Sequence, residues 1–442
     1  MKKRILIVSG REFLFRIHSL LSVLGLEIIR AQNTEEAKRL SSARDIEMAI
    51  LDQDEYRSRD RKRVLSSIMK KLVRSRKKFM MVSSQKTLSA LLEAKARGAS
   101  DYVIRPFNYR EFIARFNAIS RDKKRLASIG GGTGLFHLLL GLKGLSNTLL
   151  TSIVSMADDG GSSGRLRASF GILPPGDVRR SLVALSNAPE IMNQIMQYRF
   201  MKGGGVKGHS FGNLFLTALT EIKGSLPRAV KTISDILNVQ GIVIPVTDAL
   251  GTLRARFKDG TVVEGESRID LSEGRSPGVH LKELSYKKKV ECNTDAFEAI
   301  LNADVLIIGP GDLYTSVIAS LLVGGISEAI RRTGAKKVYI CNLMTKPGET
   351  AHFKAEDHIR EIVKYLGGDY LDYVIISDTK LSREAIKEYK KKNQAPVTVG
   401  DLKKIREITR AKIILADVGD EKELVRHDER KIAAEIGKLL KK

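Results

Sequence analysis

Two adjacent aspartates among glycines and serines form the stretch of the sequence with the clearest chemical meaning. They open the segment DDGGSSGR at 158–165, which follows an expected strand over 150–156. Neighbouring carboxylates repel each other and glycines add flexibility, so stability alone would rarely favour this loop. The combination suits carboxylates that hold a metal ion or sugar hydroxyls, glycines that admit phosphate and an arginine that pairs with it. The ligand-binding candidates are Asp158, Asp159, Ser162, Ser163 and Arg165, and the metal-binding candidates are Asp158 and Asp159.

A second glycine-rich loop, GGGTG at 130–134, lies between an expected strand over 126–129 and an apolar helix over 135–142. Glycine lets the backbone approach a ligand closely, and a helix start offers N–H groups and positive dipole to an anion. The spacing differs from the dinucleotide-binding fingerprint, whose third glycine would fall at Leu135. We predict a phosphate site formed by Gly131, Gly132, Thr133 and Gly134.

A third loop follows an expected buried strand over 304–308. Ligands of open α/β sheets bind beyond the carboxyl ends of the strands, so this loop is expected at the same crevice as the first two. Its candidates are Gly311, Tyr314 and Thr315. The tyrosine could stack on a base or a sugar, or it could simply pack, and the threonine could cap a helix or contact phosphate.

Three more polar residues lie next to expected helices. Asp177 could be the N-cap of a helix over 178–187 or a ligand contact, and the sequence leaves both open. His209 is a candidate general acid–base or phosphate donor, although a single histidine is often structural. Asn213 lies in the same GHSFGN motif and is a candidate ligand contact.

The first 120 residues alternate between apolar runs and helical patterns. Strands are expected over 5–8, 26–30, 48–51, 79–82 and 102–104, with helices between them, the first over 13–24. Five strands alternating with helices predict a doubly wound sheet of the flavodoxin-like type.

This segment resembles a response-regulator receiver (CheY-like) domain. Asp52 closes the third strand, where receivers carry the phosphoacceptor, and Arg105-Pro106-Phe107 follows the fifth, where they carry Lys-Pro-Phe. Ser83 or Ser84 takes the place of the receiver hydroxyl. Glu12 alone stands where receivers place an acidic pair, so Mg²⁺ should bind poorly and phosphoryl transfer to Asp52 should be inefficient. We expect a degenerate receiver, with an inactive Asp52, that serves in docking or dimerisation.

The positive charge is concentrated in this first part. The chain of 442 residues has a net charge of +25, and residues 1–125 hold 30 Lys and Arg against 14 Asp and Glu, or +16. The densest run, 57–78, could attract nucleic acid, anionic lipid or an acidic protein, or it could be a solvated helix face. The basic residues do not alternate with aromatic ones, which argues against single-stranded nucleic acid.

Composition excludes several classes of protein. At 43% hydrophobic and 29% charged residues the chain is globular, and two cysteines cannot form a disulfide framework or a cysteine-rich zinc site. No run of about 18 apolar residues occurs, so no transmembrane segment is expected, and no signal-peptide core follows the basic start. A cytoplasmic protein is the expectation.

Six ordered motifs carry a family resemblance over about two-thirds of the chain. Residues 126–418 resemble the YvcK branch of the CofD-like superfamily, the gluconeogenesis factors. The motifs are GGGTGL at 130–135, ADDGGSSGRLR at 157–167, GILPPGDVR at 171–179, GHSFGNL at 208–214, GPGDLYTS at 309–316 and CNLMTKPGET at 341–350. The resemblance implies a Rossmann-like nucleotide-binding core. A hairpin expected near 253–264 indicates a small β-rich insertion over 242–290.

The resemblance implies two functions. The first is binding of a nucleotide-sugar such as UDP-N-acetylglucosamine, with regulation of cell shape and of carbon flux to the envelope, and without a settled catalytic reaction. The alternative is a CofD-like, Mg²⁺-dependent 2-phospho-L-lactate transferase or a related transferase. We expect a receiver-like domain over 1–122, a CofD/YvcK-like nucleotide-binding domain over 126–442, a homo-oligomer and an unknown protein partner of the first domain. A nucleic-acid-associated regulator is a weaker reading that rests on charge alone.

Overall fold

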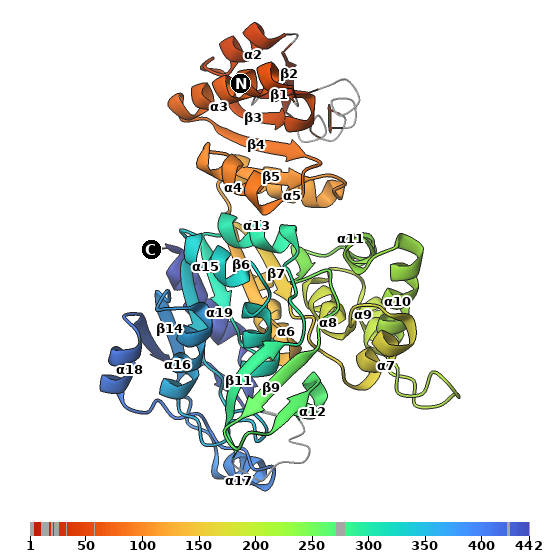
Figure 1. Ribbon diagram of the computed structural model, residues 1–442, viewed down its shortest axis with the longest axis vertical. Coiled ribbons are helices and arrows are strands. Elements are labelled where there is room, and N and C mark those ends of the chain that lie inside the picture. Colours follow the sequence, from red (N-terminus) through yellow and green to blue (C-terminus); the bar gives the residue numbers. More distant parts are fainter. Residues whose placement is uncertain are drawn as a thin grey trace. The chain divides into compact units, whose positions relative to one another are not determined.

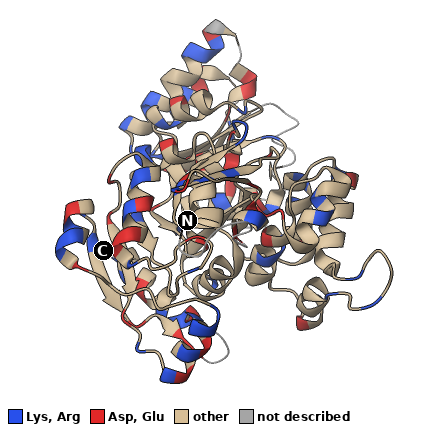
Figure 2. Cartoon of the chain, turned by 60° about the horizontal axis from the view of Figure 1, so that its bottom comes forward, with Lys and Arg blue, Asp and Glu red and all other residues tan. Residues whose placement is uncertain are grey.

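The computed structural model describes residues 4–9, 17–18, 21, 26–31, 33–56, 58–270, 279–421 and 425–441. The chain folds into two compact units, Met1–Lys123 and Lys124–Lys442 (Figure 1). Among the described residues no helix combines the length and the apolar character needed to cross a membrane. Figure 2 shows Lys and Arg together with Asp and Glu on helices throughout the chain, and the residues after 125 carry the remaining +9 of the net charge of +25.

The first unit is built on a parallel five-stranded sheet with the order β2-β1-β3-β4-β5. This is the flavodoxin-like order, as predicted from the sequence. The strands are β1 Arg4–Val8, β2 Glu27–Arg30, β3 Ile46–Asp52, β4 Lys78–Ser83 and β5 Asp101–Ile104. The helices are α2 Thr34–Leu40, α3 Arg59–Arg74, α4 Leu88–Ala96 and α5 Tyr109–Ser120, with a 3₁₀ turn at Gln53–Tyr56. Most of the expected helix over 13–24, and Glu12, lie outside the described residues.

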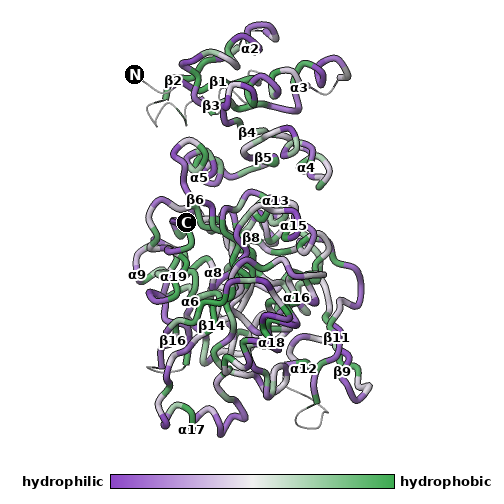
Figure 3. The backbone as a smooth tube through the Cα atoms, turned by 90° about the vertical axis from the view of Figure 1, so that its left-hand side faces the viewer, coloured by the Kyte–Doolittle hydropathy of each residue, from purple (hydrophilic) through white to green (hydrophobic). Residues whose placement is uncertain are grey.

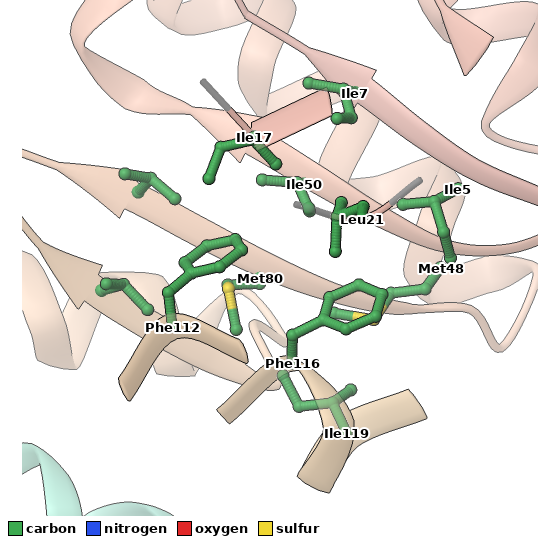
Figure 4. Close-up of a cluster of buried hydrophobic side chains, with 12 residues drawn as sticks. Ile5, Ile7, Ile17, Leu21, Met48, Ile50, Met80, Phe112, Phe116 and Ile119 are labelled. Carbon is green, nitrogen blue, oxygen red and sulfur yellow. The ribbon is translucent and has the colours of Figure 1, made fainter. Parts of the chain in front are cut away.

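The core of this unit is formed by α5 and the adjacent face of the sheet. Phe112, Phe116 and Ile119 are spaced four and three residues apart, which places them on one face of a helix. Figure 4 shows them packed against side chains of the central strands, including Ile50 and Met80. Because helices cover both faces of the sheet, β3 is buried along almost its whole length, and this fixes Asp52 at its carboxyl end.

The second unit is built on a parallel seven-stranded sheet with the order β15-β14-β13-β12-β6-β7-β8. This is the Rossmann-type order with one additional strand at one edge. The strands are β6 Lys124–Gly130, β7 Thr148–Val154, β8 Ile242–Pro245, β12 Val305–Ile308, β13 Lys336–Ile340, β14 Tyr373–Ser377 and β15 Lys412–Ala416. A two-stranded ribbon, β16 Gly419–Asp420 and β17 Arg426–His427, follows near the end of the chain.

Helices cover the seven-stranded sheet, and α6 packs between α8 and α19, where Figure 3 shows a hydrophobic centre. The helices before the insertion are α6 Gly132–Lys143, α7 Gly161–Phe170, α8 Gly176–Leu185, α9 Glu190–Gln197, α10 Phe211–Lys223 and α11 Leu226–Ile236. Those that follow are α12 Glu266–Asp270, α13 Thr294–Asn302, α14 Ala319–Leu321, α15 Ile326–Arg332, α16 Ala355–Leu366, α17 Arg383–Lys391, α18 Leu402–Ile408 and α19 Glu429–Lys441, with a π-helical turn, η2, at Leu313–Ile318.

The β-rich insertion is smaller than expected. β9 Leu253–Phe257 and β10 Val262–Glu264 form the predicted antiparallel hairpin, and β11 Leu281–Tyr286 pairs with the other edge of β9. The expectation that the insertion begins at residue 242 is wrong, because β8 belongs to the parallel sheet and is buried throughout. A short apolar run cannot by itself distinguish the two kinds of strand.

Candidate functional site

The centre of the seven-stranded sheet contains a topological switch point. β6 pairs with β7 on one side and with β12 on the other, so the chain leaves these neighbouring strands toward opposite edges. Loops that diverge in this way leave a crevice at the carboxyl ends of the strands, where open α/β sheets bind ligands. The loops after β6 and β12 touch there, because a Cβ on Gly134 would lie 3.0 Å from the backbone carbon of Pro310.

A cleft of about 420 Å³ opens at this point. Four segments line it: the glycine-rich loop, the loop after β12, the loop after β13, and residues brought in from α17 and β17. The lining includes Gly131, Gly132, Thr133, Gly134, His137, Gly311, Asp312, Lys346, Tyr389, Lys392 and Arg426. Of the residues predicted from the sequence, the four of the glycine-rich loop and Gly311 therefore lie in one cleft.

The glycine-rich loop leads directly into α6. Gly131 is the N-cap and Gly132 the first helical residue, so the N-cap residue itself has no side chain with which to cap this end of the helix. Gly132 has φ +67°, which favours glycine, and a Cβ there would meet no atom within 4 Å. First-turn N–H groups have no acceptor within their own helix, so the start of α6 offers Thr133 and Gly134 N–H to an anion. The loop has the geometry that phosphate binding requires.

Asp177 resolves the alternative that the sequence left open. It lies within the first turn of α8 rather than at its N-cap, and its Oδ2 accepts a hydrogen bond of 2.8 Å from Gly132 N–H. It therefore caps α6, a helix distant in sequence. Burial raises the pKa of Asp177 to about 6, with a further contribution from Asp158, while Arg180 acts in the opposite direction. A carboxylate that titrates near neutral pH lies directly against the expected phosphate position.

The two adjacent aspartates have different roles in the structure. Both carboxylate oxygens of Asp159 accept backbone N–H bonds from Glu266 and Ser267, at 2.9 and 2.8 Å, so Asp159 caps the short helix α12. Asp158 accepts one bond from Gly160 N–H, and its Oδ2 lies next to Gly176. Asp159 therefore has a structural role as the cap of α12, whereas Asp158 Oδ2 faces the start of α8. The expected pair of metal ligands is not presented as a pair.

A cluster of three carboxylates, separate from the two aspartates above, surrounds Lys346. Oxygens of Asp270, Asp312 and Glu349 lie within 4.8 Å of one another, an arrangement that could hold a metal ion. The Lys346 ammonium occupies it, with ion pairs to Asp270, to Asp312 at 2.7 Å and to Glu349 at 3.6 Å. Burial opposes its charge, yet these carboxylates raise the pKa of Lys346 above its usual value. The lysine supplies the positive charge that a metal ion would otherwise provide.

Glu266 is the most strongly shifted carboxyl group next to Asp158. Burial, followed by the charges of Asp158 and Asp270, raises the pKa of Glu266 to about 8. It is therefore protonated at neutral pH and can donate a hydrogen bond. Glu266 is not among the residues predicted from the sequence, because only the fold brings α12 near Asp158.

The candidates from α7 and α10 form a buried polar network. Arg165 Nε donates to His209 Nε2 at 3.2 Å, so the imidazole proton resides on Nδ1, which lies 3.0 Å from Ser162 Oγ. Asn213 Nδ2 donates to the same oxygen at 3.1 Å, and Asn213 Oδ1 accepts from Arg179 Nε at 2.9 Å. Burial, with Arg165, lowers the pKa of His209. The network leaves Ser162 to donate its own proton, and His209 is not placed to act as its base.

Ser163, the chain neighbour of Ser162, lies on the side of Gly176 and Asp158. A Cβ added to Gly176 would lie 2.4 Å from Ser163 Oγ and 3.1 Å from Asp158 Oδ2, so both oxygens lie beside Gly176. Both serines lie in the first turn of α7, which begins at Gly161 inside the segment read from the sequence as a loop. A second helix start, with φ +48° at Gly161 and open space beside it, therefore follows Asp158.

Tyr314 and Thr315 do not line the cleft. The turn η2 begins at Leu313, earlier than the sequence indicated, and buries both side chains. Tyr314 is 0% exposed and packs edge-on against Phe353, so it offers no platform to a base. Thr315 Oγ1 donates to Glu349 Oε1 at 2.6 Å, and Glu349 also accepts from Tyr314 N–H.

Several cleft residues were not identified from the sequence. Tyr389 is half-buried in the lining, and Lys392 and Arg426 contribute positive charge beside it. Arg426 donates to His137 Nε2 at 3.1 Å, and His137 Nδ1 in turn contacts Glu429 at 2.8 Å, which orients the arginine toward the cleft. These residues come from the end of the chain, where no local motif marks them, so only the fold assigns them to the site.

The phosphoacceptor-like site of the first unit is filled by protein groups. Arg105 donates to both oxygens of Asp52, at 3.1 and 2.8 Å, and also to Asp54 at 3.0 Å. Ser9 Oγ donates to Asp52 Oδ2 at 2.6 Å, while Ser84 is bonded to Asp54 rather than to Asp52. A bidentate guanidinium thus lies where an incoming phosphoryl group and a metal ion would need to bind.

The known proteins that resemble this chain match its second unit. The family described as "2-phospho-L-lactate transferase CofD" matches residues 126–418, and the chain belongs to this family. Within it, the chain is 40% identical over 324 residues to the gluconeogenesis factor of Bacillus subtilis, covering 72% of this chain and 99% of that protein. It is 42% identical over 314 residues to the gluconeogenesis factor of Halalkalibacterium halodurans, covering 71% and 96%.

A solved structure supports the same assignment. The crystal structure of a Bacillus halodurans protein has 40% sequence identity and a TM-score of 0.68, covering 72% of this chain and 100% of that one. The second unit comprises 319 of the 442 residues, which agrees with the 72% of this chain that the solved structure covers. The receiver-like unit is an addition to the part that these relatives share.

Proposed function

We propose that this protein binds a nucleotide-sugar of the UDP-N-acetylglucosamine type in the cleft at the switch point. The observation that carries the proposal is the start of α6, where Thr133 and Gly134 N–H face a cleft between two diverging loops, while Gly132 N–H is bonded to Asp177. A diphosphate fits there, because the N–H groups and the helix dipole favour negative charge. Lys392 and Arg426 add positive charge to the lining of the cleft, and Arg426 is held by His137 of α6.

The remaining parts of such a ligand also find matching groups. Tyr389 is the aromatic side chain that lines the cleft, so it takes the role of base platform that the sequence analysis gave to Tyr314. Sugar hydroxyls need acceptors and donors beside the phosphate. Asp158 Oδ2 is such an acceptor, and Ser163 Oγ lies next to it. The proposed ligand would therefore extend from Tyr389 across the start of α6 toward Asp158.

The proposed role is regulatory, in the control of carbon flux to the envelope and of cell shape. The name shared by the relatives, gluconeogenesis factor, supports a function in carbon metabolism. The arrangement around Ser162 supports binding rather than covalent catalysis, because the neighbouring imidazole donates its proton instead of accepting one. A sensor of this kind would respond to the ligand through the loops that enclose it.

Calorimetry with UDP-N-acetylglucosamine tests the proposal. Asp158→Asn keeps the shape of the side chain and removes a charge-assisted hydrogen bond, so the expected loss of affinity is about ten-fold to a hundred-fold. Asp159→Asn is the matched control, since Asp159 caps α12 and should affect stability more than binding. Absence of binding by the intact protein refutes the ligand, and equal affinities in wild type and Asp158→Asn refute its placement.

One observation favours a second candidate, a Mg²⁺-dependent transferase of the CofD type. Asp158 and Asp177 place two carboxylates beside the expected phosphate; Asp158 adds to the burial that raises the pKa of Asp177, and Arg180, 3.6 Å from Asp177, offsets part of this charge. A divalent cation bound with the ligand would relieve the repulsion that remains. Incubation of the protein with Mg²⁺, the nucleotide-sugar and small hydroxy acids, followed by mass spectrometry, separates the candidates. A transferred product supports the transferase, whereas intact, tightly bound ligand supports the sensor.

A further inference from the structure

The first unit has a groove that the proposed function does not use. It lies between α3 and α4, which Figures 1 and 3 show next to each other on one side of the five-stranded sheet, and its volume is about 640 Å³. Both helices contribute side chains, and the loops after β3 and β4 close one end. The lining residues are Gln53, Lys62, Arg63, Leu65, Ser66, Ser67, Met69, Lys70, Met81, Gln85, Ala90, Glu93, Ala94 and Arg97.

The rim of the groove carries uncompensated positive charge. Lys62, Arg63 and Lys70 are exposed, and in the described part of the chain none of them forms an ion pair or a hydrogen bond through its side chain. The one carboxylate in the lining, Glu93, is already paired with Arg97. Three unpaired cations along one groove form a local field that attracts anionic groups.

The floor of the groove is apolar and adaptable. Leu65, Met69 and Met81 are buried beneath the rim, and Ala90 and Ala94 on α4 are small, which gives the groove its depth. Methionine side chains adjust to differently shaped apolar partners. A ligand that fits this groove therefore combines negative charges at its edges with apolar side chains toward the floor.

These features select among the anionic partners that the charge alone would allow. The described residues that line the groove include no Phe, Tyr or Trp, so they provide no surface on which bases could stack. A nucleic-acid duplex would contact the rim phosphates without filling the concave floor. A peptide can do both, since its carboxylates reach the rim and its apolar side chains enter the groove.

We infer that the groove between α3 and α4 binds an acidic, amphipathic peptide segment of a partner protein. Lys62, Arg63 and Lys70 pair with its carboxylates, and Leu65 and Met69 pack against its apolar side chains. The net charge of +16 over residues 1–125 accelerates the encounter with such a partner. The groove is also linked to the core of the unit. The hydroxyl of the buried Tyr102 lies 3.1 Å from Gln53 Oε1 and 3.3 Å from the Gln85 carbonyl oxygen, and both glutamines line the groove.

Selection from a random peptide library displayed on phage, with the full-length protein immobilised, tests the inference without a known partner. We expect enrichment of peptides that are rich in Asp and Glu and contain regularly spaced Leu, Ile or Met. A fluorescein-labelled copy of the most enriched peptide is then titrated by anisotropy against the wild type and the triple variant Lys62→Glu, Arg63→Glu, Lys70→Glu. The expected weakening in that variant is about ten-fold or more.

The control is a triple variant with the same change in charge elsewhere on the unit. Arg30, Arg44 and Arg121 are exposed and lie outside the groove, and their replacement by Glu should leave binding within about two-fold of wild type. Enrichment without acidic peptides, or equal weakening in both triple variants, overturns the inference. Duplex DNA that displaces the peptide and depends on the same three residues overturns it in favour of a nucleic-acid site.

Discussion

Replacing Gly132 by alanine should weaken binding of a diphosphate ligand far more than it weakens the fold. Gly132 has φ +67°, a region where an L-residue costs about 1–2 kcal/mol. A Cβ at this position meets no atom within 4 Å, so no clash adds to that cost. Folded domains have a stability of about 5–15 kcal/mol, so the variant should remain folded.

The new methyl group would, however, extend into the cleft in front of the first turn of α6. A phosphate could no longer approach Thr133 and Gly134 N–H at hydrogen-bonding distance. Loss of one hydrogen bond to a charged group costs about 1.5–3 kcal/mol. This corresponds to an increase in Kd for UDP-N-acetylglucosamine of about ten-fold to a hundred-fold.

Calorimetry of the full-length protein measures Kd, and urea unfolding measures the loss of stability. Gly224→Ala is the matched control, because Gly224 also has a left-handed φ, +76°, and open space at its Cβ position, yet it ends α10 away from the cleft. The two variants should lose similar stability, and only Gly132→Ala should lose affinity. Wild-type affinity in Gly132→Ala would show that no phosphate binds at α6. Equal loss of affinity in both variants would show that it follows from weakened folding.

Four further outcomes can be measured. The pKa of Asp177 is raised to about 6, so its negative charge disappears as pH falls through 6 and the affinity for an anionic ligand should rise there. The variant Asp177→Asn should bind that ligand more tightly at pH 7 than the wild type does, and calorimetry should show a flatter dependence of its affinity on pH. Burial lowers the pKa of His358 and of His427 from 6.5 to about 4, so each costs about 3 kcal/mol of stability as pH falls from 6.5 toward 4; His358→Leu should remove its own share of that dependence in urea unfolding and leave the share of His427. Acetyl phosphate with Mg²⁺ should give no adduct of about 80 Da in intact-mass measurements; a stoichiometric adduct lost in Asp52→Asn would contradict the blocked site. Removal of residues 1–122 should leave ligand affinity unchanged, and a large loss would place part of the site in the first unit.

The fold was predictable to the extent that buried strands form continuous apolar runs. The five strands of the first unit and the central strands of the second were recognised because parallel strands covered on both faces need no polar alternation. Helix starts were less predictable. α7 begins at Gly161 and η2 at Leu313, within segments whose glycines and prolines indicated loops. A helix N-terminus tolerates glycine, so the same residues fit both states.

The candidate site was predictable where one segment supplies both the geometry and the chemistry. The glycine-rich loop is such a segment, and it lies in the cleft as expected. Asp159 and Thr315 could not be assigned correctly, because their oxygens bond to groups more than thirty residues away. Tyr389 was missed for the same reason: α17 reaches the cleft only after the sheet has formed.

The two α/β units use the carboxyl ends of their strands in opposite ways. In the second unit, open N–H groups at α6 leave space for an anion, and the nearest carboxylate, Asp177, is poised to lose its charge. In the first, Arg105 already pairs with Asp52 and Asp54, so the position is satisfied without a phosphoryl group. Displacing a bidentate guanidinium from a buried carboxylate would leave that charge uncompensated, at a cost of about 3–5 kcal/mol. If the first unit regulates the second, binding of a partner in the groove beside Gln53 is therefore a less costly route than phosphorylation of Asp52.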